Sequence, residues 1–385
     1  MGNQPWSPGW SIEVRTPAAK APAATPQNWV KLADKSSWQA PRYKKSVDEG
    51  ALIDCRPKWA GSHSAFRTSL GHEMSHDIIG DVHGHAPALE ALLQKLGYRN
   101  RRGSWRHPTR TAVFVGDLID RGPGQVQTLQ IVRAMTDSGS ARVTMGNHEF
   151  NAIAFATPHP EEGADYLRTH RGNAGRKNKQ QHQQFLTEVG FDTAEHREWI
   201  TWFLTFPLWI ETPEFRVVHA CWSPVDVAIV KVYLPEAPNI TPGQLLACSN
   251  GSRLCEAVDT LLKGSEIILP HGLTFTDKDG HIRSKIRTRW WDSTATTYSA
   301  TYAGPPGVLM PDDVVPAGHR IPEPDRPTFI GHYWFDPAVE ISPASRRVAC
   351  VDYSVAAGGL LVAYRFDGET ELSTDKFVAV EAQKG

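Results

Sequence analysis

The 385-residue sequence has little of several features that would assign it quickly to a class of protein. Its 41 basic and 42 acidic residues leave a formal net charge of −1, so no global field draws it to nucleic acid or to an acidic membrane. No apolar run approaches the ~20 residues that a membrane-spanning helix needs. The first ten residues lack a basic stretch followed by an apolar one, so we predict no secretory signal and a cytoplasmic location.

Cysteine is also scarce, and several common catalytic motifs are missing. The five cysteines are scattered and never form a C-x-x-C pair, so we predict reduced thiols and no cysteine-built zinc site. The sequence contains no Gly-rich phosphate loop and no G-x-G-x-x-G fingerprint, which argues against nucleotide binding of those types. It also contains no G-x-S-x-G nucleophile elbow.

The composition changes along the chain and indicates how it is organised. Residues 1–45 are rich in proline, alanine and lysine without sustained periodicity, so we predict a tail or strap. Residues 46–385 are predicted to form one domain. Within it, the polar and basic stretch 157–190 is predicted as an insert, either an ordered cap or a mobile loop.

Short apolar runs that end in Gly, Asp, Asn or His recur from residue 76 onward, and each is typical of a buried strand. They span 77–84, 111–122, 141–149, 215–222, 266–272 and 327–334. Between the first two runs, leucines at helical spacing followed by Gly97 predict a helix. The resulting strand–helix–strand unit indicates an α/β fold with a parallel or mixed sheet and covering helices. The stretch 346–369 is predicted to be a hairpin.

Each of the six runs ends in a side chain that can bind a metal ion. In α/β sheets, sites gather beyond the carboxyl ends of strands, so these side chains can converge. Carboxylate, amide and imidazole ligands without thiolates suit manganese, iron or zinc. A carboxylate that can bridge two ions suits a binuclear centre.

The motifs at these positions resemble those of the calcineurin-like metallophosphoesterase superfamily, in the branch of phosphoprotein phosphatases and symmetrical dinucleoside tetraphosphatases. GDVHG at 80–84 is similar to the family's GDxHG, and GDLIDRG at 116–122 to its GDxxDRG. GNHE at 146–149, VHA at 218–220 and GH at 331–332 follow in the family's order. The segment with Asp352 resembles a late D-T-G motif, although Tyr and Ser replace Thr and Gly.

This resemblance implies a sandwich of two mixed β-sheets flanked by helices, with the metal site at the carboxyl-terminal ends of the strands. It implies two divalent transition ions, for which we expect Mn²⁺, with iron or Zn²⁺ as alternatives. Asp117 would bridge the two ions. The implied ligands are Asp81, His83, Asp117, Asn147, His219 and His332.

The resemblance also assigns roles in catalysis. His148 would donate a proton to the leaving oxygen, and Asp120 would hold His148 in the right tautomer. Arg121 would clamp phosphate oxygens through its planar fork, and Asn147 would contact phosphate as well. Arg287 stands three residues before a tryptophan, as a phosphate-contacting arginine does in nucleotide phosphatases of the family.

Some residues near these motifs have two readings. Arg289 competes with Arg287 for the phosphate, and His271 is a further candidate near the site. Trp222, Trp290, Trp291 and Trp334 follow site motifs and could stack on a base, but packing of the sheet edges is the favoured interpretation. A cationic rim that attracts polyphosphates is one reading of the insert; a solubilising loop is the other. Its basic residues are Arg168, Arg171, Arg176, Lys177 and Lys179.

The implied reaction is hydrolysis of phosphate esters or anhydrides by direct attack of a metal-bridging water or hydroxide. The substrate would be a phosphorylated small molecule, a nucleotide or a phosphoprotein, and a dinucleoside polyphosphate hydrolase is the alternative to a phosphoprotein phosphatase. A non-catalytic metal- or phosphate-binding regulator is a weaker reading, because every ligand and the proton donor are present. Nucleic-acid processing would use the basic stretch 99–110, for which we predict a solvated loop instead. We expect a monomer.

Overall fold

The computed structural model describes most of the chain after residue 74. The described ranges are 75–161, 165–235, 237–249, 251–276, 282–304 and 307–382. The predicted tail at 1–45 lies outside them, as does the start of the predicted domain at residue 46. In these ranges no helix is long and apolar enough to cross a membrane.

Two mixed β-sheets form the centre of the fold. The six-stranded sheet has the order β14-β15-β1-β4-β5, with β16 paired to β15, and its strands β1, β4 and β5 run parallel. These strands are β1 (Ser75–Ile79), β4 (Arg110–Phe114), β5 (Ala141–Val143), β14 (Asp352–Tyr353), β15 (Leu360–Phe366) and β16 (Phe377–Glu381).

The second large sheet has the order β13-β12-β7-β6. Strand β12 (Thr328–Ile330) runs parallel to both β7 (Arg216–Val218) and β13 (Val348–Cys350). Strand β6 (Trp209–Glu211) closes this sheet in antiparallel pairing with β7. The predicted architecture of two mixed sheets is therefore confirmed.

The two sheets face each other across an apolar interior. Ile78 and Val113 of the first sheet belong to the same buried cluster as Val217 and Phe329 of the second. Because side chains alternate along a strand, the next residue of each strand points away from this interior. Ile79 is one example, and it belongs to a larger buried cluster that includes side chains of the covering helices.

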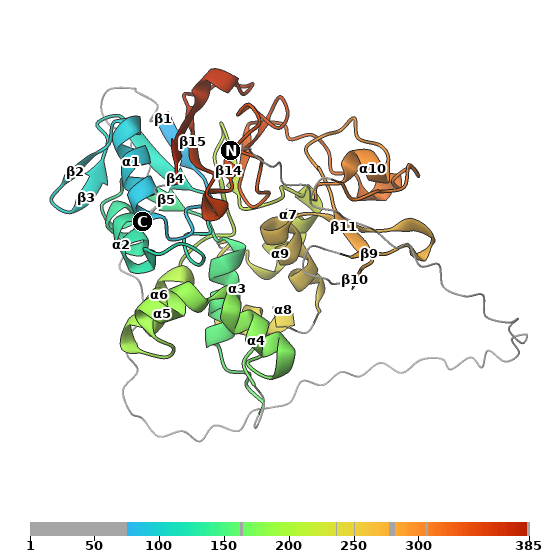
Figure 1. Cartoon of the computed structure of the whole chain (residues 1–385), viewed down its shortest axis with the longest axis horizontal. Helices are drawn as coiled ribbons and strands as arrows, with labels where there is room; N and C mark the ends of the chain where they lie inside the picture. The colour runs from blue at the N-terminus through green and yellow to red at the C-terminus, as the bar shows by residue number, and fades with distance from the viewer. Residues whose placement is uncertain are drawn as a thin grey trace, which may run out of the picture. The chain divides into compact units, whose positions relative to one another are not determined.

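Helices cover the sheets and connect their strands. They are α1 (Ala86–Leu96), α2 (Gln125–Asp137), α3 (Asn147–Ala156), α4 (Gly172–Gln181), α5 (Gln183–Val189), α6 (Ala194–Phe203), α7 (Pro224–Tyr233), α8 (Pro242–Ser249), α9 (Arg253–Lys263) and α10 (Tyr298–Thr301). The predicted helix after the first strand is α1, and Gly97 ends it in the left-handed conformation that glycine permits. Helix α1 contacts β15 and β16, whereas α2 contacts β5 (Figure 1).

Three small two-stranded sheets complete the fold. β2 (Arg99–Arg101) pairs with β3 (Ser104–Arg106), β8 (Glu266–Ile268) with β11 (Lys285–Arg287), and β9 (Phe275–Thr276) with β10 (Ile282–Arg283). The basic stretch 99–110 is therefore largely a hairpin and not the predicted loop, because buried Trp105 anchors β3 to the core.

Two segments differ from their predictions. The run at 266–272 does form a strand, β8, but β8 pairs only with β11 and joins neither large sheet. The stretch 346–369 is a hairpin only in its second half, where β14 pairs with β15. Its first part, β13, belongs to the second large sheet.

The insert at 157–190 contains regular structure, which favours the ordered cap over the mobile loop for the residues described. Its helices α4 and α5 contact each other, and α5 also contacts α2 and α6 (Figure 1). Before them, Pro158 and Tyr166 form an isolated β-bridge. The rings of Tyr166 and Phe155 both stack on that of His170, with centroids 3.9 Å away.

Candidate metal centre

Six side chains predicted as ligands converge on the loops that follow five strands of the two sheets. Asp81 and His83 follow β1, Asp117 follows β4, Asn147 follows β5, His219 follows β7 and His332 follows β12. All but His332 are at least nine-tenths buried. The loops turn so sharply that His83, Asp117 and His332 have positive φ angles of 46°, 51° and 71°. Such backbone strain in non-glycine residues is common at functional sites.

Asp117 lies at the centre of the cluster. Its Oδ2 atom is 3.3 Å from Nε2 of His219 and 3.7 Å from Nε2 of His83. Two sets of three side chains, His83–Asp117–His148 and Asp117–His219–His332, have ligand atoms within 4.8 Å of one another. Because Asp117 belongs to both sets, its position fits a carboxylate shared by two ions.

Asn147 links the second set. Its Oδ1 atom is 3.0 Å from Nε2 of His219 and 2.7 Å from Nδ1 of His332. Nδ1 of His219 lies 2.9 Å from the carbonyl oxygen of Val115, which fixes the orientation of the ring and directs Nε2 into the cluster.

Several buried ligand atoms have no hydrogen-bond partner among the described residues. They are Oδ1 of Asp81, Nε2 of His83 and Nε2 of His332. Nδ1 of His83, in contrast, lies 2.8 Å from the carbonyl oxygen of Ile119, so only Nε2 is left to bind a ligand. Buried polar atoms without partners are costly. Divalent cations would satisfy them, so the donor set fits the implied metals.

The electrostatics of the cluster also suit cations. Burial, with the charge of His148, lowers the pKa of His83 to about 3, so this imidazole is neutral, as a metal ligand must be. Burial and the carboxylate of Asp352 raise the pKa of Asp81. Carboxylates that lie close together in a buried site repel one another, and they ionise when a nearby cation compensates their negative charge.

His148 and Asp120 form a close pair beside the cluster. Nδ1 of His148 is 2.5 Å from Oδ2 of Asp120, and its Nε2 is 3.8 Å from Oδ2 of Asp117. Burial alone would lower the pKa of His148, but the carboxylates of Asp117 and Asp120 outweigh it and raise that pKa. The pair thus has the geometry of a proton-donating histidine oriented by a carboxylate.

Glu149 organises the loop that carries Asp117. Its carboxylate accepts hydrogen bonds from the backbone nitrogens of Asp117, Leu118 and Gly146, at 2.9, 2.8 and 3.2 Å. Gly146 also lies where a Cβ atom would come within 2.2 Å of the Asp117 backbone, so only glycine fits. The sequence alone predicts no role for Glu149, although it is the last residue of the GNHE motif.

Asp352 has a similar role in the loop of His332. Its carboxylate accepts hydrogen bonds from the backbone nitrogens of Trp334 and Ser354, at 2.8 and 3.0 Å. These bonds use the backbone of Ser354, so Ser can stand where the family's motif has another residue. Asp352 therefore fixes the loop of His332, although the residues after it differ from the motif.

Arg121 lies at the exposed edge of the site against Trp334. Its guanidinium carbon is 4.3 Å from the centroid of the Trp334 ring, which in turn is 6.4 Å from the ring of His83. Arg121 has a φ of 73° and an exposed side chain. It can therefore reach a ligand at the cluster while the indole supports its position.

The two competing arginines have different surroundings. Arg287 in β11 is half-buried. Burial, and next the charge of Arg287, lower the pKa of His332, so Arg287 is close enough to act on this predicted ligand. Its Nε atom is buried without a partner among the described residues. Arg289 is exposed, and its charge acts on Asp292. The surroundings favour Arg287.

The further candidate His271 is exposed, and its Nε2 lies 3.0 Å from Oδ1 of Asp313. It follows β8, which is not a strand of either large sheet, so no strand end directs it to the cluster.

Three of the four tryptophans after site motifs are packing residues. Trp222, Trp290 and Trp291 are buried in the large apolar cluster, and Nε1 of Trp290 donates to the carbonyl oxygen of Ala220. Only Trp334 of these four is partly exposed, and it is the one beside His83. The packing interpretation is thus confirmed for three, whereas Trp334 lies against Arg121 and His83.

The region that carries most of the candidate ligands is similar in sequence to known proteins. The sequence profile of calcineurin-like phosphoesterases matches residues 74–224, which include five of the six ligands and the His148–Asp120 pair. This part of the chain is similar to that family, as the motifs predicted.

Two curated relatives share parts of this region. The chain is 47% identical over 76 residues to the asymmetrical bis(5'-nucleosyl)-tetraphosphatase PrpE of Halalkalibacterium halodurans, which covers 20% of this chain and 31% of that protein. It is 30% identical over 170 residues to the symmetrical bis(5'-nucleosyl)-tetraphosphatase of Psychromonas ingrahamii, which covers 43% and 51%. The chain thus spans about a third to a half of the length of these relatives.

Among solved structures, the cold-active protein-tyrosine phosphatase of a Shewanella species is 16% identical. It covers 80% of each chain with a TM-score of 0.39.

Proposed function

We propose that the protein is a metal-dependent phosphoesterase that hydrolyses phosphate esters or anhydrides at the cluster around Asp117. The observation that carries this proposal is the convergence of ligand side chains from five strand ends, several with buried atoms that have no partner among the described residues. Most buried polar atoms with a structural role have a hydrogen-bond partner. A non-catalytic regulator would not require the additional His148–Asp120 pair.

Two divalent ions held there would lower the pKa of an attacking water and neutralise charge on the phosphoryl oxygens. The ligands would be the six side chains predicted from sequence, with Asp117 shared between the ions. We propose Mn²⁺ as the native metal, since the donor set is rich in oxygen and imidazole and has no thiolate.

The remaining side chains would handle the phosphate and the leaving group. Arg121, supported by Trp334, would hold phosphoryl oxygens, and Arg287 and Asn147 would contact phosphate from the other loops. His148 would give its proton to the departing oxygen while Asp120 holds the ring and stabilises its charged form. The buried position of this pair keeps bulk water away from the transferred proton.

For the substrate we propose a nucleotide with several phosphates, such as a dinucleoside polyphosphate, in preference to a phosphoprotein. The names of the two tetraphosphatase relatives support this choice. The partly exposed indole of Trp334 next to Arg121 supports it too, because it could stack on a base while Arg121 holds phosphate. We further propose that residues 46–385 form the catalytic domain and act as a monomer in the cytoplasm.

The test is a turnover screen of the full chain with and without Mn²⁺. The substrates are p-nitrophenyl phosphate, a phosphopeptide, a mononucleotide and a dinucleoside tetraphosphate. We expect hydrolysis that depends on the metal, with the highest kcat/KM for the dinucleoside tetraphosphate. No turnover of any substrate would contradict the enzyme assignment, and a preference for the phosphopeptide would contradict the proposed substrate class.

A further inference from the structure

A second histidine shares the carboxylate that orients His148. His182 lies between α4 and α5 of the insert, and its Nδ1 is 2.9 Å from Oδ2 of Asp120. The same oxygen is 2.5 Å from Nδ1 of His148. Both histidines are almost completely buried, as is Asp120. Nothing in the sequence motifs pointed to His182, which stands in the polar insert.

The Asp120 side chain has few other restraints. Its Oδ1 atom has no hydrogen-bond partner among the described residues. The two imidazoles are thus its hydrogen-bond partners there, and removal of His182 would leave only His148. A carboxylate with one partner can rotate about its side-chain torsions, whereas two donors from different elements fix its plane.

This arrangement also fixes the tautomer of His148. A carboxylate oxygen can only accept, so Nδ1 of each ring must donate its proton to Oδ2. Nε2 of His148 is then directed toward Asp117, whose Oδ2 is 3.8 Å away. The atom from which a proton would reach a leaving group is therefore held on the side of the metal centre.

The insert holds the backbone of Asp120 as well as its side chain. Near the end of α5, the carboxylate of Glu188 accepts hydrogen bonds from the backbone nitrogens of Gln125 and Val126, at 2.8 and 2.9 Å. The side-chain oxygen of Gln125 in turn accepts from the backbone nitrogen of Asp120 at 2.6 Å. Both ends of α5 thus connect to Asp120, from His182 on one side and Glu188 on the other.

We propose that His182 is a positioning residue for the proton donor His148, and that the insert 157–190 serves the reaction by holding it against Asp120. This inference rests on the proposed phosphoesterase function. It gives the insert a role in catalysis that does not depend on its surface charge. Its effect should appear in the step that needs a proton, and not in substrate binding.

The test compares two substrates of different leaving-group basicity. The His182→Leu variant should lower kcat for an alkyl phosphate by roughly 10–100-fold, the range seen when a group that orients a functional histidine is removed. For p-nitrophenyl phosphate, whose leaving group hardly needs a proton, kcat should change little. KM should stay nearly constant for both substrates.

Two further variants separate positioning from folding. His182→Asn can donate an amide N–H to Asp120 and should recover most of the lost kcat. His170→Leu is the matched control, because His170 lies in the same insert and its Nε2 donates a hydrogen bond to the carbonyl oxygen of Phe155, whereas the partners of Asp120 are His148 and His182. It should lower the melting temperature without changing the ratio of the two kcat values.

A spectroscopic measurement gives an independent result. In ¹H–¹⁵N spectra of the histidine rings, the Nδ1 proton of His148 should exchange faster with water in His182→Leu than in the wild type. His182→Asn and His170→Leu should retain the slow exchange. Faster exchange in all three variants would indicate a general loosening of the insert and would overturn the positioning role.

The outcomes distinguish the two proposals. If His148→Ala does not change the leaving-group dependence, the proposed role of His148 fails. If His148→Ala changes it but His182→Leu does not, only the role of His182 fails. Equal losses of kcat on both substrates for His182→Leu, or no recovery with His182→Asn, would also overturn it.

Discussion

The two ends of strands β7 and β12 carry opposite kinds of polar chemistry. At their carboxyl ends, His219 and His332 join the candidate metal-ligand cluster, where Nε2 of His332 has no partner in the part of the chain that the structure describes. At their amino ends, Arg216 begins β7 and Asp325 precedes β12. These two residues line a cavity of about 430 Å³ in which charged groups neutralise one another.

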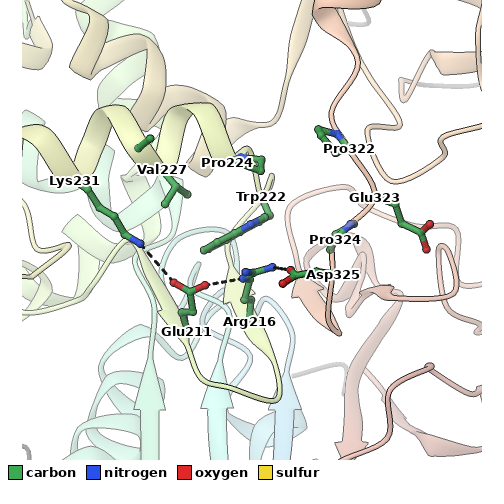
Figure 2. A pocket seen from close by; sticks show the side chains of 11 residues that line it. Glu211, Arg216, Trp222, Pro224, Val227, Lys231, Pro322, Glu323, Pro324 and Asp325 are labelled. Carbon is green, nitrogen blue, oxygen red and sulfur yellow. Dashed lines mark hydrogen bonds and ion pairs between the residues drawn. The ribbon is translucent and has the colours of Figure 1, made fainter.

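Figure 2 shows how the charges in this cavity are paired. Glu211 lies between Lys231 and Arg216, at 3.7 Å from Nζ of the lysine and 2.9 Å from Nε of the arginine. Arg216 also forms an ion pair with Asp325, and its guanidinium carbon lies 4.5 Å from the ring centroid of Trp222. The cationic groups thus already have partners within the protein.

The charges at the two ends have different roles. Those at the amino ends stabilise the fold, and those at the carboxyl ends serve the proposed reaction. Both ends contain buried polar side chains near an aromatic ring. In the described part of the chain, the carboxyl ends bring together several buried ligand atoms without a hydrogen-bond partner, which costs stability unless a cation or substrate binds. The convergence of such atoms, and not the density of charge, therefore marks the candidate site.

The largest expected effect comes from Asp117→Asn at the carboxyl ends. Asp117 belongs to both ligand sets, so the variant should lose both ions. Metals contribute several kcal/mol to the transition state, so kcat/KM should fall by about 10³-fold or more. Asp325→Asn at the amino ends is the matched control and should keep metal content and activity. Comparable losses in both variants would remove the distinction between the two ends.

The next effect concerns His148→Ala. Because an acid supplies roughly 10²–10⁴-fold in rate, kcat for an alkyl phosphate should fall within that range. The metal content, measured by elemental analysis, should stay close to that of the wild type. A smaller loss is expected for p-nitrophenyl phosphate, and an equal loss on both substrates would argue against proton donation.

Arg216→Met should affect stability and leave the chemistry unchanged. The variant removes charged hydrogen bonds to Glu211 and Asp325, so we expect a loss of about 1–3 kcal/mol in the free energy of unfolding by urea. The kcat and the metal content should not change. A fall in kcat with unchanged stability would show that the amino ends participate in catalysis.

The same pair predicts a pH dependence of stability. Burial would raise the pKa of Asp325, but hydrogen bonds and charges of Arg326 and Arg216 outweigh it and lower that pKa to about 2. The resulting stabilisation is present above the ordinary value of 3.8 and is lost as the pH falls through about 2. The stability difference between wild type and Arg216→Met should therefore shrink below pH 4. A constant difference down to pH 2 would contradict this origin.

The smallest effect is expected from the surface charges of the insert. Arg168 is bound to Gln181, which lies next to His148, so it belongs with the site and should be left in place. The other basic residues are Arg171, Arg176, Lys177 and Lys179. Changing these four to Ser should raise KM for a polyphosphate a few-fold and weaken its salt dependence.

A small monoester should barely respond to this change, because it reaches only the metals and Arg121. If both substrates respond alike, or if neither does, the cationic rim has no role in attracting substrate. The positions of α4 and α5 beside the site would then matter only through His182 and Glu188.

The sequence predicted the site where local pattern and ligand type coincide. Apolar runs of strand length ended at Asp81, Asp117 and His219, and parallel strands place such ends on one edge. The sequence also predicted the βαβ unit, because the leucines of α1 have helical spacing and Gly97 ends the helix. These features depend on residues that are close together in the chain, so a single sequence is enough to predict them.

The remaining features depend on long-range pairing. β8 has an apolar pattern similar to that of β12, but the pattern does not specify which strand it pairs with. The step of the chain from one sheet to the other between β13 and β14 has no turn signal. His182 lies 62 residues from Asp120, in a polar stretch whose periodicity suggests nothing about burial.

The most direct test of the account is the metal stoichiometry of the full chain. The apoprotein, prepared with a chelator, would be reconstituted with Mn²⁺ and analysed by elemental analysis after removal of free metal. We predict two ions per chain, together with activity that appears as the second ion binds. Saturation at one ion per chain, or full activity of the apoprotein, would contradict a binuclear centre built around Asp117.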